Sequence, residues 1–350
     1  MTIGKHIAIF LGIMLFTPFI SGMLIPGCFE SHVTPVPRPA PREIIQEGPV
    51  KLVFVGDIMM SRNVSAMIEN NYNGDYGFLF DHVEDYLNQA DIAFGNLESV
   101  ISNLGLPNKI KGAPLFRANP SAVDALVSAG FDILSVANNH CFDYGAVAME
   151  DSFNTLRRNG IQDVGGGFKA EEAYAPVIFA VKNNNDETIM KIAYLALNAV
   201  ADTGYQSWIA TSDGSGIAWA TTESMEKAVY MARSLADVVI VSLHFGTQYE
   251  TLPKNKVQDD LAHLAIDRGA DLVIGHHPHV VQPVMSYSGK YIVYSLGNFI
   301  FDRDGDLTRE GMVVEVILQD KEIVEITPKC YTINSLYQPE FNGKSHCWVE

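Results

Sequence analysis

Apolar runs of strand length alternate with helix-length amphipathic segments along most of this 350-residue chain. The first apolar run, at residues 51–57, predicts a strand. Three later pairs each place an amphipathic segment directly before an apolar one, at residues 121–130 and 131–140, 223–236 and 237–246, and 256–269 and 270–279. Strands that alternate with helices need crossover connections, so the pattern predicts an α/β fold centred on sheets.

The C-terminal part of the chain has a different pattern. Apolar runs at residues 289–301, 311–320 and 321–333 follow one another with only turns between them. Such runs favour antiparallel pairing, so the sheets should be mixed. The sequence has no solenoid-type repeat and no later linker, which predicts one domain over residues 50–350.

The predicted strands carry polar residues at both ends. Four of them begin with an aspartate, namely Asp91, Asp132, Asp237 and Asp271. About seven residues separate each aspartate from the polar cluster that ends its strand, roughly one sheet height. The carboxyl ends of such strands meet at one sheet edge, where ligands bind in α/β folds. We therefore expect eight side chains to converge there: Asp57, Glu98, Asn139, His140, His244, His276, His277 and His279.

Each of these residues also has a structural interpretation. Asp57 could cap a following helix, Asn139 could sit in a left-handed turn, and His244 could be a hydrogen-bonded core histidine. Eight such residues at equivalent strand ends favour a shared site instead. Carboxylates, imidazoles and an amide together suit one or two divalent transition-metal ions such as Mn, Fe or Zn.

The first 28 residues predict a targeting segment. Lys5 precedes an apolar stretch from Ile7 to Pro26, long enough for a signal peptide or one membrane anchor. The end of that stretch, LIPGC, resembles a bacterial lipobox, which would leave Cys28 as a lipidated N-terminus. A retained anchor is the alternative. Both interpretations predict an exported protein tethered through its N-terminus to the outer face of the cytoplasmic membrane.

Residues 29–49 contain alternating prolines, which predict an extended, semi-rigid linker between membrane and domain. Export would permit a disulfide, and Cys330 and Cys347 lie close together in the sequence. The formal net charge of -17 excludes the basic surface that nucleic-acid binding needs.

Seven motifs together resemble those of a known family. They are VGDIMMSR, GNLESVI, FRANP, VANNHCFDYG, SLHFGTQYE, GHHPHVVQ and YSLGNFIFD, in order over residues 51–302. They are similar to the motifs of the CapA family, poly-γ-glutamate capsule synthesis proteins of the calcineurin-like metallophosphatase superfamily. The resemblance implies a four-layer αββα sandwich with mixed sheets and a metal site at the strand ends.

The resemblance also implies which residues hold metal. The six implied ligands are Asp57, Glu98, Asn139, His244, His277 and His279. Asp57 and His279 would bind the first ion, and Glu98 would bridge to the second. His276 falls at a position that the superfamily pattern leaves open, so we expect it in a supporting role.

The same resemblance implies that His140 acts as a general acid and that Asp143 orients it. Four cations follow the site strands and could bind an anionic substrate group, although solvated loop charges are the ordinary alternative. They are Arg62, Lys109, Lys111 and Arg117.

Two positions depart from the superfamily pattern. Met59 stands where a histidine ligand is usual, and Glu98 replaces an aspartate. The first ion would therefore have one nitrogen ligand fewer. The fold expectation is unaffected, but phosphatase activity does not follow from the fold alone.

Three functions are compatible with this sequence. The favoured one is a membrane-tethered CapA-like protein for synthesis or export of an anionic polymer, with a metal-dependent hydrolase site. The alternatives are a non-catalytic polymer-binding scaffold for membrane synthase subunits and a general exported phosphoesterase. The charge of -17 disfavours extended contact with a polyanion, whereas a small metal-centred site avoids that repulsion.

Overall fold

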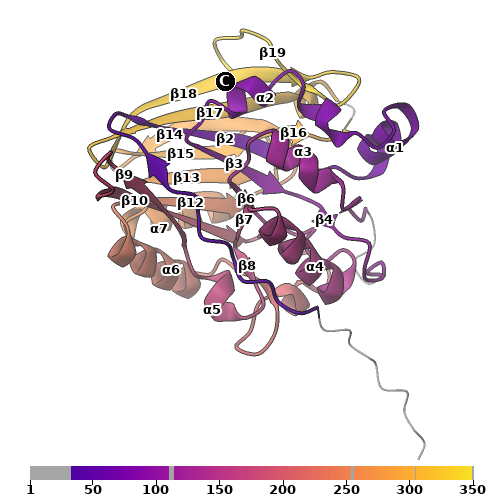
Figure 1. Ribbon diagram of the computed structural model, residues 1–350, viewed down its shortest axis with the longest axis horizontal. Coiled ribbons are helices and arrows are strands. Elements are labelled where there is room, and N and C mark those ends of the chain that lie inside the picture. The colour runs from indigo at the N-terminus through magenta and orange to yellow at the C-terminus, as the bar shows by residue number, and fades with distance from the viewer. Residues whose placement is uncertain (1–32, 110–113, 254–255, 304, 349–350) are drawn as a thin grey trace, which may run out of the picture. The chain divides into compact units, whose positions relative to one another are not determined.

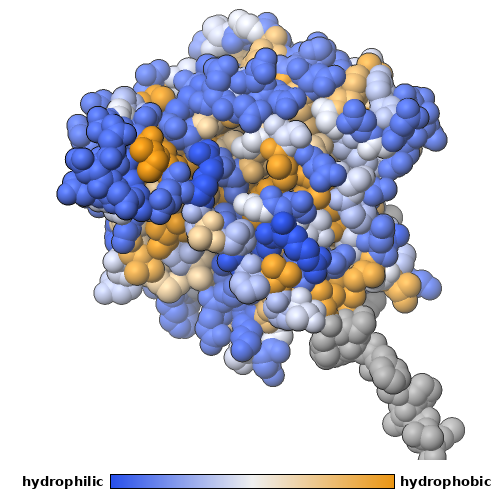
Figure 2. Space-filling model, viewed as in Figure 1, coloured by the Kyte–Doolittle hydropathy of each residue, from blue (hydrophilic) through white to orange (hydrophobic). Residues whose placement is uncertain are grey.

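The computed structural model describes residues 33–109, 114–253, 256–303 and 305–348. The expected targeting segment at residues 1–28 therefore lies outside the described residues. Across the described part of the chain, every helix is too short or too polar to cross a bilayer. The surface seen in Figure 2 is mostly hydrophilic and is interrupted by separate apolar patches.

Two mixed sheets form the centre of the domain (Figure 1). Sheet A has the strand order β1 (Ile44–Ile45), β9 (Val177–Lys182), β10 (Thr188–Asn198), β12 (Val238–His244), β13 (Leu272–His276), β15 (Lys290–Leu296) and β14 (Val281–Tyr287). Sheet B has the order β19 (Pro339–Phe341), β18 (Glu322–Ile333), β17 (Glu310–Gln319), β2 (Val50–Ile58), β3 (Ile92–Leu97), β6 (Ile133–Ser135) and β7 (Gln162–Val164), and β16 (Asn298–Ile300) pairs with β2. Two short ladders join β4 (Val100–Ile101) to β5 (Arg117–Ala118) and β8 (Gly166–Gly167) to β11 (Gly216–Ile217).

Helices cover the outer faces of the two sheets. The pair α6 (Thr222–Leu235) and α7 (Lys256–Asp267) packs on sheet A, and α4 (Gly145–Arg158) packs against β7 and β4. The remaining helices are α1 (Arg62–Asn71), α2 (Glu84–Leu87), α3 (Ala122–Ser128), α5 (Ala170–Ala173) and α8 (Asp306–Arg309), with 3-10 turns η1 (Tyr76–Phe80) and η2 (Tyr205–Trp208). The predicted four-layer αββα arrangement with mixed sheets is confirmed.

Alternation along β10 explains how two apolar layers form. Ile192 and Tyr194 face the core between the sheets, whereas Ala193 and Leu195 face the core beneath α6 and α7. Successive side chains of a strand point to opposite faces, so a strand buried on both sides must be apolar throughout. The continuous apolar runs in the sequence are therefore the signature of central strands.

The aspartates at the strand starts have a structural role. Each accepts a hydrogen bond from a backbone N–H of the neighbouring strand. The pairs are Asp91 with Lys51 (2.7 Å), Asp132 with Ala93 (3.0 Å), Asp237 with Lys191 (2.9 Å) and Asp271 with Val239 (2.9 Å). These bonds satisfy donors at the edge of the sheet opposite the candidate site.

The expected linker at residues 29–49 requires a correction. Residues 36–46 pack on the domain instead of extending from it. The Val36 N–H donates to Asn154 (2.7 Å), the Arg38 guanidinium pairs with buried Asp163, and β1 adds in parallel to the edge of sheet A at β9. The alternating prolines keep this arm extended, but polar groups between them find buried partners on the domain.

Other predicted elements differ in extent and partner. β6 covers only three residues, so Asn139 and His140 lie in the following turns rather than on a long strand. The antiparallel pairing expected near the C-terminus holds for β17 with β18, whereas β15 joins the other sheet in parallel with β13. The sequence left open whether Cys330 and Cys347 pair; they form a disulfide, which ties the C-terminal segment to β18.

Candidate metal centre

Both sheets deliver polar side chains to one place at their carboxyl edges. In sheet B, Asp57 is the penultimate residue of β2 and Glu98 directly follows β3; in sheet A, β12 ends at His244. His277 and His279 follow β13 directly. All five side chains are buried, as the convergence of parallel strand ends predicts.

The backbone around these residues is tightly constrained. Gly56, directly before Asp57, has no space for a side chain, because a Cβ would lie 2.0 Å from the Gly297 carbonyl oxygen. His277 and His279 have φ angles of +97° and +59°, which are unfavourable for residues other than glycine. Strain of this kind is found where a structure must aim particular side chains.

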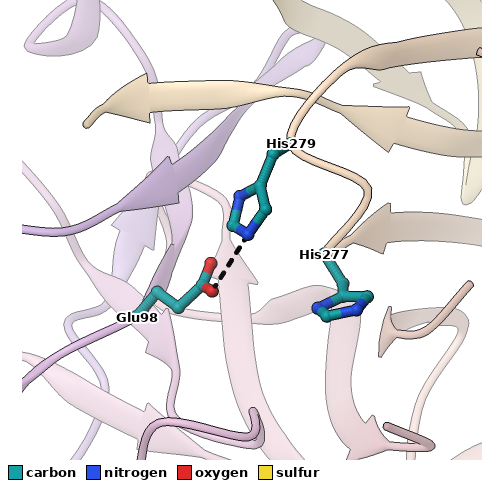
Figure 3. Close-up of side chains that lie close together, drawn as sticks. All are labelled: Glu98, His277 and His279. Atoms are coloured by element: carbon teal, nitrogen blue, oxygen red, sulfur yellow. Dashed lines mark ion pairs between the residues drawn. The ribbon is translucent and has the colours of Figure 1, made fainter. Parts of the chain in front are cut away.

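The candidate ligands form two groups that share one carboxylate. The first group is Glu98, His277 and His279, and the second is Asp57, Glu98 and His244. Within each group the ligand atoms lie within 4.8 Å of one another. Figure 3 shows the Glu98 carboxylate directed at His279, whose Nε2 is 3.7 Å from Glu98 Oε1. A shared carboxylate is the arrangement that a bridged pair of ions requires.

Asn139 joins the second group through histidine contacts. His244 Nε2 lies 3.0 Å from Asn139 Oδ1 and 3.1 Å from His277 Nδ1. Asn139 Nδ2 donates to Asp202 (2.8 Å), which turns the amide oxygen toward His244. The sequence had not indicated Asp202, because it lies in the loop after β10 and outside the seven motifs.

Burial and neighbouring charges set the protonation of the ligands. Burial alone would raise the pKa of Asp57, but contacts with His276 and His279 lower that pKa well below its usual value. Burial, together with the nearby His277, lowers the pKa of His244 well below the ordinary histidine value. An ionised carboxylate and a neutral imidazole are the forms that bind metal.

His276 and two amides surround the ligands. His276 Nδ1 is 3.2 Å from Asp57 Oδ1, consistent with its expected supporting role. Asn96 donates to the same Asp57 oxygen (2.9 Å), and Asn298 Oδ1 lies 2.9 Å from His279 Nδ1. Asn96 and Asn298 occur in the quoted motifs but were not among the predicted site residues. Both lie at one end of a strand, where residues that hydrogen-bond to metal ligands are common.

His140 and Asp143 lie beside the ligands as a hydrogen-bonded pair. His140 Nδ1 is 2.7 Å from Asp143 Oδ2, and His140 Nε2 is 3.8 Å from Glu98 Oε1. Phe116 stacks on the imidazole at a centroid distance of 3.8 Å, and its N–H also donates to Asp143 (2.6 Å). The pair is therefore fixed in orientation, with Nε2 directed toward the candidate metal centre.

Three of the four predicted substrate-binding cations lie in the described part of the chain, and each has different surroundings. Arg62 pairs with Asp302 at 3.2 Å, and the Arg117 guanidinium lies 4.0 Å from the centroid of the Tyr144 ring. Lys109 is exposed, and Lys111 lies outside the described residues. A substrate role for these four residues stays a prediction.

The donor set fits divalent transition metals. It combines two carboxylates with three imidazoles and an amide oxygen, all buried. Within the described residues, the buried Nε2 of His279 has no hydrogen-bond partner, as expected of an atom that binds an ion. Met59, which stands where the family resemblance implies a histidine ligand, is buried in the apolar core and offers no nitrogen atom.

Comparisons with known proteins show which family this chain is similar to. The family described as "Bacterial capsule synthesis protein PGA_cap" matches residues 51–303. The PGA biosynthesis protein CapA of Bacillus subtilis (strain 168) is 31% identical over 277 residues, which cover 79% of this chain and 70% of that protein. The Capsule biosynthesis protein CapA of Bacillus anthracis is 30% identical over 326 residues, covering 89% and 74%. A solved structure, the calcineurin-like phosphoesterase YfkN from Bacillus subtilis, aligns with a TM-score of 0.49 at 15% identity, over 84% of this chain and 93% of that one.

Proposed function

Because this chain belongs to the bacterial capsule synthesis protein family PGA_cap, we propose that it acts in the synthesis or export of poly-γ-glutamate through a metal-dependent hydrolase site. The single observation that carries the hydrolase part is the pair of ligand groups that share Glu98. Two divalent ions held in this way supply Lewis acidity toward an ester or amide bond. The substrate would be an anionic polymer or a phosphoester, and only its reacting group would enter the metal centre.

His140 is the residue of this chain that handles the leaving group. Its Nδ1–H is held by Asp143, which leaves Nε2 to carry and deliver a proton. The Phe116 ring covers one face of the imidazole and keeps bulk water from it. Water supplies the hydroxyl group that replaces the leaving group, and a proton passed from Nε2 to the departing oxygen or nitrogen lets that group leave without forming an unstable anion.

One observation favours a second function. Met59 removes a nitrogen ligand from the first ion, and a weakly held ion would leave a binding site without turnover. A non-catalytic scaffold that binds the polymer beside membrane synthase subunits would have this property. The two functions differ in one measurable respect, which is turnover by the metal-loaded protein.

We also propose that the protein works on the outer face of the cytoplasmic membrane. The apolar stretch at residues 7–26 supports export, by cleavage at Cys28 or by retention as an anchor. The disulfide between Cys330 and Cys347 supports an oxidising compartment, because such bonds are rare in the cytosol.

The enzymatic proposal is tested with the full chain and two variants. Bound Mn, Fe and Zn are measured by elemental analysis, and hydrolysis is assayed on phosphomonoesters, phosphodiesters and poly-γ-glutamate. His277→Ala should lose metal and turnover together. His140→Ala should keep its metal and lose roughly 100-fold or more in rate, because only proton transfer is removed.

His82→Ala is the matched control, because this half-exposed histidine pairs only at the surface with Glu340. It should change neither metal content nor rate. Unchanged metal and turnover in both site variants would reject the hydrolase. Polymer binding that survives in variants without turnover would favour the scaffold.

A further inference from the structure

The chain that follows β16 runs along one side of the metal centre. Asn298 contacts His279, and the Phe301 ring packs on the same imidazole at a centroid distance of 4.8 Å. Tyr249 approaches that imidazole from another segment, at 6.2 Å between ring centroids. Two aromatic rings therefore flank the His279 side of the site.

Arg303 lies against both of these rings. Its guanidinium carbon is 5.7 Å from the Tyr249 ring centroid and 5.9 Å from the Phe301 centroid. Tyr249 is fixed in turn, because its N–H donates to the carbonyl of Pro278 between the two histidine ligands (2.8 Å). Contacts with ring faces hold a guanidinium in place and leave N–H groups at its edge for a ligand.

The partners of Arg303 differ from those of the predicted cations. Arg62 is neutralised by Asp302, whereas Arg303 forms no ion pair with any residue that the structure describes. Its Nε is buried and lacks a hydrogen-bond partner within the same described residues. A buried N–H without a partner costs free energy, so a ligand that completes the bond would bind favourably.

We propose that Arg303 is a specificity-determining residue that binds an oxyanion group of the substrate beside the metal centre. The inference rests on the proposed function, because that function places the substrate at the metal centre, but it does not require that the protein turns the substrate over. A guanidinium presents two parallel N–H groups, which match the two oxygens of a carboxylate or phosphate. The carboxylates of Asp57 and Glu98 would not neutralise two divalent ions, so an anionic group would be attracted to this position.

The sequence signal for Arg303 was present but weak. The residue comes directly after the motif YSLGNFIFD, and no strand end or spacing marks it. Only the approach of Tyr249 and Phe301 to His279 shows that this arginine lies near the ligands.

The test measures binding, so it does not depend on turnover. The full-length protein is loaded with manganese and titrated calorimetrically with γ-glutamylglutamate, with an analogue in which all three carboxylates are replaced by neutral carboxamides, and with inorganic phosphate. Arg303→Met should weaken binding of the charged ligand about tenfold to a hundredfold and leave that of the carboxamide unchanged. Arg303→Lys should restore part of the loss, because it keeps the charge without the paired N–H groups.

The comparison between ligands identifies the source of the oxyanion. A loss confined to γ-glutamylglutamate assigns a carboxylate, and a loss confined to phosphate assigns a phosphoryl group. Arg158→Gln is the control. The Arg158 side chain is largely exposed, and its contact with Asp151 is weak, with 4.0 Å between the guanidinium nitrogen and the carboxylate oxygen. It should bind every ligand as the wild type does.

Three results would overturn the inference. They are unchanged binding in Arg303→Met, equal weakening for charged and neutral ligands, and a loss of manganese in that variant. Failure of the proposed hydrolase would look different. The wild type would then turn over no substrate, while the loss of oxyanion binding in Arg303→Met would still support this inference.

Discussion

The charge and direction of Asp57 depend on individual neighbours. Asn96 and His276 both contact Asp57 Oδ1, and Asn96 also lies 3.3 Å from His244 Nδ1. One amide thus touches a residue from each of the two ligand-bearing sheets. Partners that orient ligands matter for metal affinity nearly as much as the ligands do.

Replacing Asn96 with alanine tests this at the residue scale. Asn96→Ala should weaken manganese or zinc binding roughly tenfold to a hundredfold, because Asp57 loses the donor that fixes its oxygen. Competition with a calibrated chelator measures the affinity. Asn88→Ala removes an exposed amide that bonds only to backbone carbonyls of Glu84 and Ser128, and it should bind metal normally. Equal affinity in both variants would show that Asn96 does not orient the site.

At the scale of elements, the N-terminal arm depends on a buried ion pair. Asp163 is fully buried and pairs with Arg157 from α4 at 2.7 Å and with Arg38 from the arm at 3.4 Å. Burial acts to lower the pKa of Arg157, but the contacts with Asp163 and Glu172 together outweigh it and raise that pKa. Arg157 and Arg38 thus share the Asp163 carboxylate, and Arg157 also pairs with Glu172 at 2.8 Å.

Removing that carboxylate should both destabilise the fold and loosen the arm. For Asp163→Asn we expect a loss of about 3 kcal/mol in the free energy of unfolding, because the buried guanidinium of Arg157 loses its buried carboxylate and retains the partly exposed Glu172. Urea unfolding measures the loss, and trypsin cleavage after Arg42 should become faster. Asp186→Asn removes an exposed partner of Lys182 and should cost less than about 0.5 kcal/mol. Similar stability in the two variants would contradict the role of the arm contact.

Metal binding should couple the two sheets at the scale of the whole molecule. The candidate ligands Asp57 and Glu98 come from sheet B, whereas His244, His277 and His279 come from sheet A. An ion held between them binds only when the sheets are packed together. Such an ion stabilises the folded chain by about 2.7 kcal/mol at a concentration of roughly 100 times its Kd.

Thermal unfolding with and without manganese measures this coupling. Chelation should lower the Tm of the wild type by several degrees, and added manganese should restore it. Glu98→Gln lacks the shared carboxylate, so its Tm should not respond to manganese. Glu84→Gln changes the same chemical group in α2, away from the ligand groups, and should respond as the wild type does. A response in Glu98→Gln equal to that of the wild type would exclude Glu98 as a ligand.

Much of the fold and the candidate site could be predicted from the sequence. The apolar runs identified the central strands because a strand buried on both faces must be apolar along its length. Parallel strands end at the same edge, so Asp57, Glu98 and His244 could be brought together without any coordinates. The roles of Asn139 and His140 needed the family resemblance, since β6 is too short to carry them.

Contacts between segments far apart in the chain were decided only by the tertiary structure. Proline spacing predicts an extended segment over residues 29–49, but not that Arg38 reaches Asp163. Likewise, the sequence places Arg303 after a motif, while packing alone sets it against Tyr249. Periodicity reports which face of an element is buried, because that depends on local geometry. It does not report which distant side chain fills the space opposite, because that depends on how the sheets and loops pack together.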